Sequence, residues 1–315
     1  MPAPASARLQ ALELRLDNDQ FALTPADDER WYTHGFFARA TYDAAADADA
    51  PDSRVLAAWC AALIGCDPGA RSLRTVSLEQ TIHAPAYPGT PAPQPQDRPF
   101  AATLAVGLEV ASEGERTRQA LALRLGVVGP AALGEQVQNT LHGLIGETSA
   151  AGWPWQLRAQ PLVELGWSRL VRHDLPAAGL DWVSRTAATL GTPITQAAVG
   201  AMLRVGEPPA APGWPGEPAP LERGGRWHVF AGAEARAVAR NVLIDGERYG
   251  GAVSEIRRES WGGDLFAGVS LAPDRDWRVE FTAALRAVEF SVPGETPSLQ
   301  PQRFGMLVLR WTPPR

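Results

Sequence analysis

A histidine on the polar side of a short predicted helix is the group in this sequence best suited to proton transfer. Gly129-Pro130 turns the chain into the helix, and Gly146 can end it with positive φ. At about 100° per residue, one face carries Val137, Leu141, Leu144 and Ile145, and the other carries Glu135, Gln138, Asn139 and His142. An imidazole beside polar neighbours is a candidate general base. The alternative is an exposed histidine on a surface helix.

Ester hydrolysis also needs an activated nucleophile and donors or a cation where the oxyanion develops. The serines do not lie in a G-x-S-x-G motif, so the sequence does not indicate a serine hydrolase of that kind. For the other four histidines no motif supports a catalytic role, and they receive none.

The elements that must position these residues are predicted to be strands. Residues 12–17 alternate apolar and polar side chains with period two. Similar alternation recurs at 104–110, 121–125, 162–170, 199–205, 227–240, 265–271, 277–290 and 304–311. Small or charged residues at the intervening positions fit an all-β transmembrane barrel with apolar side chains toward lipid and a polar lumen. A soluble β-sandwich would give a similar pattern.

Composition limits the class of protein. The 315 residues carry a net charge of −6, which argues against a nucleic-acid partner. The longest apolar run, 55–66, is too short to cross a bilayer as a helix. All 29 basic residues are arginine, which binds phosphate bidentately. The 11 Trp against 4 Tyr weakly favour a membrane protein, since Trp concentrates at membrane interfaces.

A single domain is expected over residues 1–315, with loops at the Pro- and Gly-rich stretches 85–99, 207–225 and 291–301. Residues 44–72 are predicted to form an inserted periplasmic turn with a short helix around 55–64, between a strand after Thr33 and a strand leading to Gln80. Cys60 and Cys66 lie in this insertion, where they would either pair in an oxidising periplasm or stay as free thiols.

The two ends of the sequence match the usual features of exported outer-membrane barrels only in part. The N-terminal residues lack the charged and apolar regions of a signal peptide, but Ala5-Ser6-Ala7 has the A-x-A form of a cleavage site. We therefore expect an export signal to have been removed near this point. Trp311 is followed by Thr-Pro-Pro-Arg, whereas outer-membrane barrels commonly end on an aromatic residue.

Six short blocks of sequence resemble the lipid A 3-O-deacylase family of Gram-negative outer membranes. They occur in the family's order, from near the start to about residue 250: Asp17-Asn18-Asp19, Trp31-Tyr32-Thr33-His34-Gly35, Asp97-Arg98-Pro99-Phe100, GVVGP…EQVQN…H at 126–142, GW..QL at 152–157, and Asn241…Asp245-Gly246. The resemblance implies an outer-membrane β-barrel of about twelve strands with a short helix inside it or at its mouth.

The resemblance also implies an activity, namely a calcium-assisted esterase that removes the 3′-acyloxyacyl chain of lipid A with a histidine-activated water. His142 would be the base, Asn18 would donate to the oxyanion, and Asp19 would bind Ca²⁺. Thr33 would line the same pocket, and Glu147 would orient the imidazole.

Two other blocks are expected to be structural. Asp97-Arg98 is interpreted as a salt-bridged loop corner, and Trp153 and Trp155 as anchors at the membrane interface. Some family members carry a lysine before the Asp97-Arg98-Pro99 motif, and this sequence has none, so substrate positioning here must differ if that lysine matters.

The expected partners are lipid A or lipopolysaccharide as substrate and outer-membrane lipid around a monomeric barrel. Two other functions stay open at this point. One is an outer-membrane phospholipase acting on glycerophospholipid. The other is a non-catalytic barrel, a channel or scaffold, that keeps the motif residues for packing.

Overall fold

The computed structural model describes residues 8–21, 31–43, 54, 58, 70–220, 225–246, 254–294 and 301–314. Over these residues the chain forms a closed barrel of antiparallel strands, each paired with its neighbours in sequence, and β1 pairs with β14 to close it. The barrel strands are β1 (Leu9–Asn18), β2 (Trp31–Asp43), β3 (Arg71–Ala84), β4 (Ala101–Glu113), β5 (Thr117–Val128), β6 (Gln160–Asp174), β7 (Leu180–Gly191), β8 (Ile194–Gly206), β9 (Trp227–Asn241), β11 (Trp261–Leu271), β12 (Trp277–Arg286) and β14 (Gln302–Trp311).

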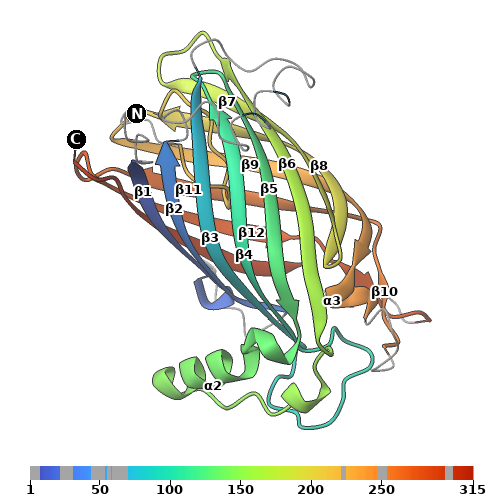
Figure 1. Ribbon diagram of the computed structural model, residues 1–315. Helices are drawn as coiled ribbons and strands as arrows, with labels where there is room; N and C mark the ends of the chain where they lie inside the picture. Colours follow the sequence, from blue (N-terminus) through green and yellow to red (C-terminus); the bar gives the residue numbers. More distant parts are fainter. Residues whose placement is uncertain are drawn as a thin grey trace.

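The helices and the remaining strands are short. They are η1 (Asp19–Phe21), η2 (Pro130–Ala132), α2 (Gly134–Ile145), η3 (Trp153–Trp155), α3 (Val242–Asp245), and the two-stranded sheet of β10 (Arg257–Arg258) and β13 (Phe290–Ser291). Helix α2 lies at one mouth of the barrel, and β1 begins and β14 ends at the opposite mouth (Figure 1). We call these the α2 mouth and the opposite mouth. Among the described residues, no helix is long and apolar enough to cross a membrane.

The predicted alternation is confirmed, because the barrel wall has an apolar outer face and a polar inner face. Apolar side chains such as Leu12, Leu14, Val76 and Leu78 are exposed on its outside. The intervening residues of β1 point inward, where Glu13 pairs with Arg39 of β2 at 2.7 Å. An apolar exterior around a polar interior is the pattern of an outer-membrane barrel.

The structure corrects two expectations about the strands, and one predicted segment lies almost wholly outside the described residues. Strand β7 was not predicted, because its outward positions include Ser184 and Thr186, which weaken the alternation. The strand expected over 277–290 stops at Arg286 and resumes only as β13. The insertion expected at 44–72, with Cys60 and Cys66, lies almost wholly outside the described residues, and its last two residues already belong to β3.

The loop predicted at 207–225 enters the lumen from the opposite mouth. We call its described part, residues 207–220, the luminal segment. The Gly216 carbonyl oxygen accepts hydrogen bonds from Arg15 of β1 at 2.7 Å and from Arg39 of β2 at 2.9 Å. The Glu217 carboxylate accepts from Arg118, Ser168 and Arg185 of β5, β6 and β7. The segment therefore spans the interior and is fastened to strands on different sides of the barrel.

Candidate active site

The segment that carries α2 packs against the outside of the barrel wall. Val76 and Leu78 of β3 are exposed outward, and alternate residues of a strand share a face, so Gln80 and Ile82 lie on the outside too. Both are nevertheless buried, because residues 129–157 cover them. Gln80 Nε2 donates to the Ala132 carbonyl oxygen at 2.6 Å, and Ile82 packs in one cluster with residues of this cover. We call residues 129–157 the rim segment.

The polar face of helix α2 packs on the chain that follows the helix, whereas Val137 of its apolar face packs on the cluster that holds Ile82 of the wall. Gln138 and His142 are buried, whereas Leu144 is 78% exposed and Ile145 62%. The predicted polar face is buried at Gln138 and His142, although Glu135 on the same face is exposed. The alternative of an exposed histidine is wrong, because the His142 side chain is buried.

The imidazole of His142 is held by the chain that follows α2. Gly146 ends the helix at φ 81°, and the reversal brings the Thr148 carbonyl oxygen to 2.6 Å from His142 Nδ1. A carbonyl only accepts hydrogen bonds, so Nδ1 carries the proton and Nε2 carries the lone pair of the neutral ring.

A hydrogen-bond partner of the ring is thus the Thr148 carbonyl oxygen, whereas Glu147 was expected to orient the imidazole. The Glu147 side chain is exposed, and its backbone N–H donates to the His142 carbonyl oxygen at 2.9 Å.

Gln138 lies one helical turn before His142 on the same buried face. Its Oε1 accepts from Trp153 Nε1 at 2.9 Å, which fixes the amide so that Nε2 supplies the remaining donors. In the part of the chain that the structure describes, this buried Nε2 has no hydrogen-bond partner. Trp153 is fully buried, so it supports Gln138 and does not anchor the chain at the membrane interface, whereas Trp155 is 48% exposed.

Asn18, Asp19 and Thr33 come together where β1 ends and β2 begins. Asn18 Nδ2 donates to the Thr33 carbonyl oxygen at 3.0 Å, and Asn18 Oδ1 accepts from Gln20 N at 2.7 Å. Thr33 falls where the register of β2 and β3 shifts between Tyr32 and His34. The Asp19 side chain is buried, and the buried Thr33 hydroxyl has no partner among the described residues.

These strand ends share the outer face of the wall with α2. Asn18 has the parity of the outward residues Leu12 and Leu14. It pairs directly with His34, and His34 pairs with Ile82, so the three form a row on one face. The rim segment covers Ile82, and two strand spacings, about 10 Å, separate β1 from β3. The predicted base and the predicted oxyanion donor thus lie on the same side of the wall at the same mouth.

A calcium ion would find few acidic ligands here. Among the described residues, no group of three or more His, Cys, Asp or Glu side chains is placed to hold a metal. Ca²⁺ also accepts hydroxyl, carbonyl, amide and water oxygens. The buried Asp19 carboxylate and the nearby Thr33 hydroxyl fit such a site, with Asp19 as its acidic ligand.

Asp97 and Arg98 form a structural corner, as expected. The Asp97 carboxylate accepts from Trp31 Nε1 at 2.9 Å and from the Ala86 and Arg98 backbone N–H groups at 2.7 Å. Burial raises the pKa of the Asp97 carboxyl above its usual value and lowers the pKa of the Arg98 guanidinium. The ion-pair partner of Arg98 is Glu289, at 3.5 Å, so the salt bridge leads to a different part of the chain.

The last matched block is structural as well. Asn241 caps α3 by accepting from Leu243 N at 3.1 Å, and Asp245 pairs with Arg258 of β10 at 3.0 Å.

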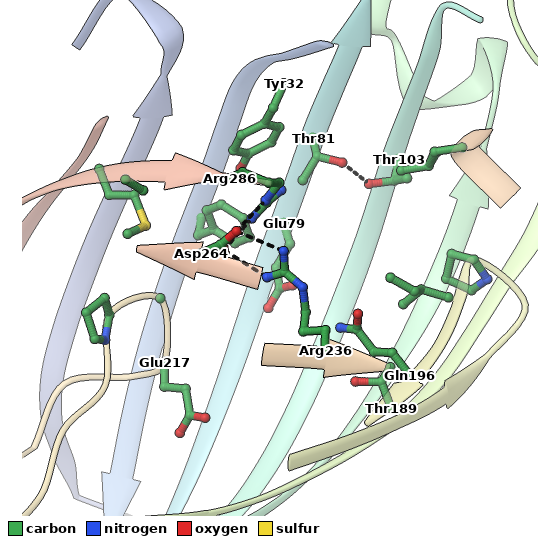
Figure 2. A pocket seen from close by; sticks show the side chains of 18 of the residues that line it. Tyr32, Glu79, Thr81, Thr103, Thr189, Gln196, Glu217, Arg236, Asp264 and Arg286 are labelled. Atoms are coloured by element: carbon green, nitrogen blue, oxygen red, sulfur yellow. Dashed lines mark hydrogen bonds and ion pairs between the residues drawn. The ribbon is translucent and has the colours of Figure 1, made fainter. Parts of the chain in front are cut away.

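A separate cavity of about 450 Å³ lies in the lumen, and its lining contains none of the predicted site residues. Figure 2 shows Arg236 and Arg286 converging on Asp264, at distances of 2.8 and 3.0 Å. Charged residues at inward strand positions were the available signal, but the sequence does not show which of them meet. The cavity lies on the inner side of the wall, and His142 and Asn18 lie on the outer side.

Comparison with known proteins agrees with this architecture. A family model described as outer membrane protein LpxR matches residues 1–312. No curated protein matches the chain. Among solved structures, LpxR from Salmonella typhimurium is similar at a TM-score of 0.74 and 19% identity, over 96% of this chain and 99% of that one.

Two other outer-membrane barrels are less similar. The β domain of the Bordetella autotransporter BrkA gives a TM-score of 0.47 and 9% identity, over 98% of this chain and 100% of that one. A KdgM porin solved in complex with disordered oligogalacturonate gives 0.42 and 4%, over 96% and 98%.

Proposed function

Because this chain belongs to the LpxR family of outer-membrane lipid A deacylases, we propose that it hydrolyses the ester of the 3′-acyloxyacyl chain with a water activated by His142. Outer-membrane location and ester hydrolysis follow from the family. The position of the ester, the base and the metal are the parts proposed here.

The observation that carries the proposal is that His142 is buried on α2. Because Thr148 holds Nδ1 in its protonated form, Nε2 is the atom that takes a proton from water. A water so activated would attack the ester carbonyl carbon, and His142 would return the proton to the leaving oxygen.

Two amides can stabilise the charge that develops on the ester oxygen. One side-chain N–H of Asn18 donates to the Thr33 carbonyl oxygen, and the second N–H can donate to another acceptor. Gln138 carries two N–H donors on the face that holds His142, and Trp153 keeps them in place. Thr33 adds a hydroxyl beside Asn18.

Asp19 would hold Ca²⁺ in part, with oxygen atoms of the backbone, of Thr33 and of the substrate as further ligands. When bound, the ion would supply positive charge to the developing oxyanion.

The substrate would reach these residues from the lipid side of the wall. The row of Asn18, His34 and Ile82 continues the outer face that carries Leu12 and Val76, so acyl chains along this face would bring their ester to α2. The luminal segment argues against a channel, because its hydrogen bonds cross the interior.

The test is to express the chain with an export signal in a Gram-negative host and to record mass spectra of the extracted lipid A. We expect loss of one acyloxyacyl unit, no loss with His142→Ala, and normal loss with His173→Ala. His173 is a matched control because it lies in β6 near the opposite mouth, stacked on Trp182. Unchanged lipid A from a folded wild-type barrel supplied with calcium would refute the proposal, and cleaved glycerophospholipid would replace it.

A further inference from the structure

The C-terminal end of α2 exposes large apolar side chains, whereas Glu135, Gln136 and Thr140 expose polar ones elsewhere on the helix. Leu133, just before the helix, and Leu141, Leu144 and Ile145 within it are all more than a third exposed. Between Glu135 and Glu147 the chain has no Asp, Glu or Arg. A helix in contact with water turns such a face inward. Here the buried positions of the helix are Gly134, Gln138 and His142.

This face continues the surface of the barrel that meets lipid. The rim segment packs on the outside of β3, β4 and β5. Further along the same strands, toward the opposite mouth, the outer face exposes Val76, Leu78, Val106, Leu108, Leu123 and Leu125. These residues form the apolar exterior of a membrane barrel. The helix therefore presents its leucines on the same side of the wall as the lipid-facing strands.

We propose that α2 is embedded in the outer leaflet, with Leu141, Leu144 and Ile145 among the acyl chains of membrane lipid. An amphipathic helix at an interface buries its apolar face at the boundary of headgroups and acyl chains. Lipid covers these three side chains, while Gly134, Gln138 and His142 are buried in the protein and Glu135 stays in water. The inference does not depend on hydrolysis and would hold for an inactive variant.

Embedding would also define a path to the site. A lipid lying beside β2 and β3 would approach the gap between the wall and α2 without leaving the leaflet. His142 and Gln138 are buried on this helix. On the proposed function, the substrate would enter sideways from the membrane and not from the water above it.

The experiment measures the surroundings of single positions in the full-length chain. Cys60 and Cys66 are replaced by Ser, Leu144→Cys is introduced, and the thiol carries an environment-sensitive fluorophore. The protein is reconstituted into phosphatidylcholine vesicles with and without dibrominated acyl chains. Glu135→Cys is the matched control, since Glu135 is exposed on the same helix and lies about 180° around it from Leu144.

We expect the label at position 144 to emit at shorter wavelength, to lose most of its fluorescence to brominated chains and to resist iodide in water. The label at 135 should show the reverse. Ile145→Cys repeats the measurement in case Leu144→Cys does not fold, which heat-modifiable electrophoretic mobility reports.

Two results would overturn the proposal. Equal iodide quenching at 144 and 135 would place both faces in water. Protection at 144 that disappears when the protein is diluted to one copy per vesicle would show that a second copy covers the face. Neither result bears on whether lipid A is cleaved.

Discussion

Replacing Trp153 by Phe tests whether this side chain holds the polar face of α2 in place. Trp153 is fully buried, and its Nε1 donates to Gln138 Oε1 at 2.9 Å. Trp153→Phe removes this donor and leaves a buried carbonyl acceptor without a partner. It also shrinks the side chain that packs on Phe100 at a ring distance of 4.9 Å.

The magnitude follows from these contacts. An unsatisfied buried acceptor costs about 1–3 kcal/mol, and the lost ring volume adds about 1 kcal/mol. A total of about 2–4 kcal/mol changes the equilibrium for docking of the rim segment by roughly 30- to 700-fold. The strand ladder does not involve Trp153, so we expect this free energy to come from docking and not from the barrel.

The assay compares deacylation with limited proteolysis of the rim segment in the folded barrel. We expect the activity of Trp153→Phe to fall by about tenfold to 100-fold, since small displacements of catalytic groups have large effects. Proteolysis within 129–157 should become faster in parallel. Trp155→Phe is the control: Trp155 is half exposed, its Nε1 donates to the Pro91 carbonyl oxygen, and its replacement should change neither readout. If Trp153→Phe matched Trp155→Phe in both, the Gln138–Trp153 contact would not hold the site.

Three further changes probe the metal, the helix end and the lumen. Chelation of calcium should abolish deacylation by the wild type, whereas Asp19→Asn should already be inactive and should not regain activity at high calcium. Gly146→Ala places a Cβ at φ 81° and should cost about 1–2 kcal/mol, seen as lower activity in a barrel of unchanged urea stability. Glu217→Gln removes the carboxylate between Arg118 and Arg185 and should lower urea stability by about 2–4 kcal/mol, while the exposed Glu207→Gln should not.

The fold could be predicted because a membrane barrel repeats one simple pattern. Outward leucines and valines alternate with charged or small inward residues along most strands. Strand β7 was not predicted, because serine and threonine occupy some of its outward positions. The two faces of α2 could be predicted from helical periodicity. Which side chains of α2 are buried could not, since that depends on how residues 148–153 fold back onto the helix.

Parts of the site could not be predicted from the sequence, for a physical reason. The group that orients His142 is a backbone carbonyl oxygen, and every residue has one, so no residue type marks Thr148. Trp153 has the composition of an interface anchor, and only its position between Phe100 and Gln138 shows that it is a buried support. The row of Asn18, His34 and Ile82 depends on strand register, which a bulge at Thr33 shifts.

The luminal segment also has a mechanical consequence. A closed sheet of this many strands can be flattened in cross-section without losing an interstrand hydrogen bond, because the bending is shared among all of them. Gly216 binds Arg15 and Arg39 on one side of the barrel, and Glu217 binds Arg118 and Arg185 on another. Together these contacts brace the barrel across its interior and set its width. Strands β1 and β2, which carry Arg15 and Arg39, also carry Asn18 and Thr33 at their ends. Stiffness built from ion pairs inside the barrel thus preserves the shape of a site on its outer surface.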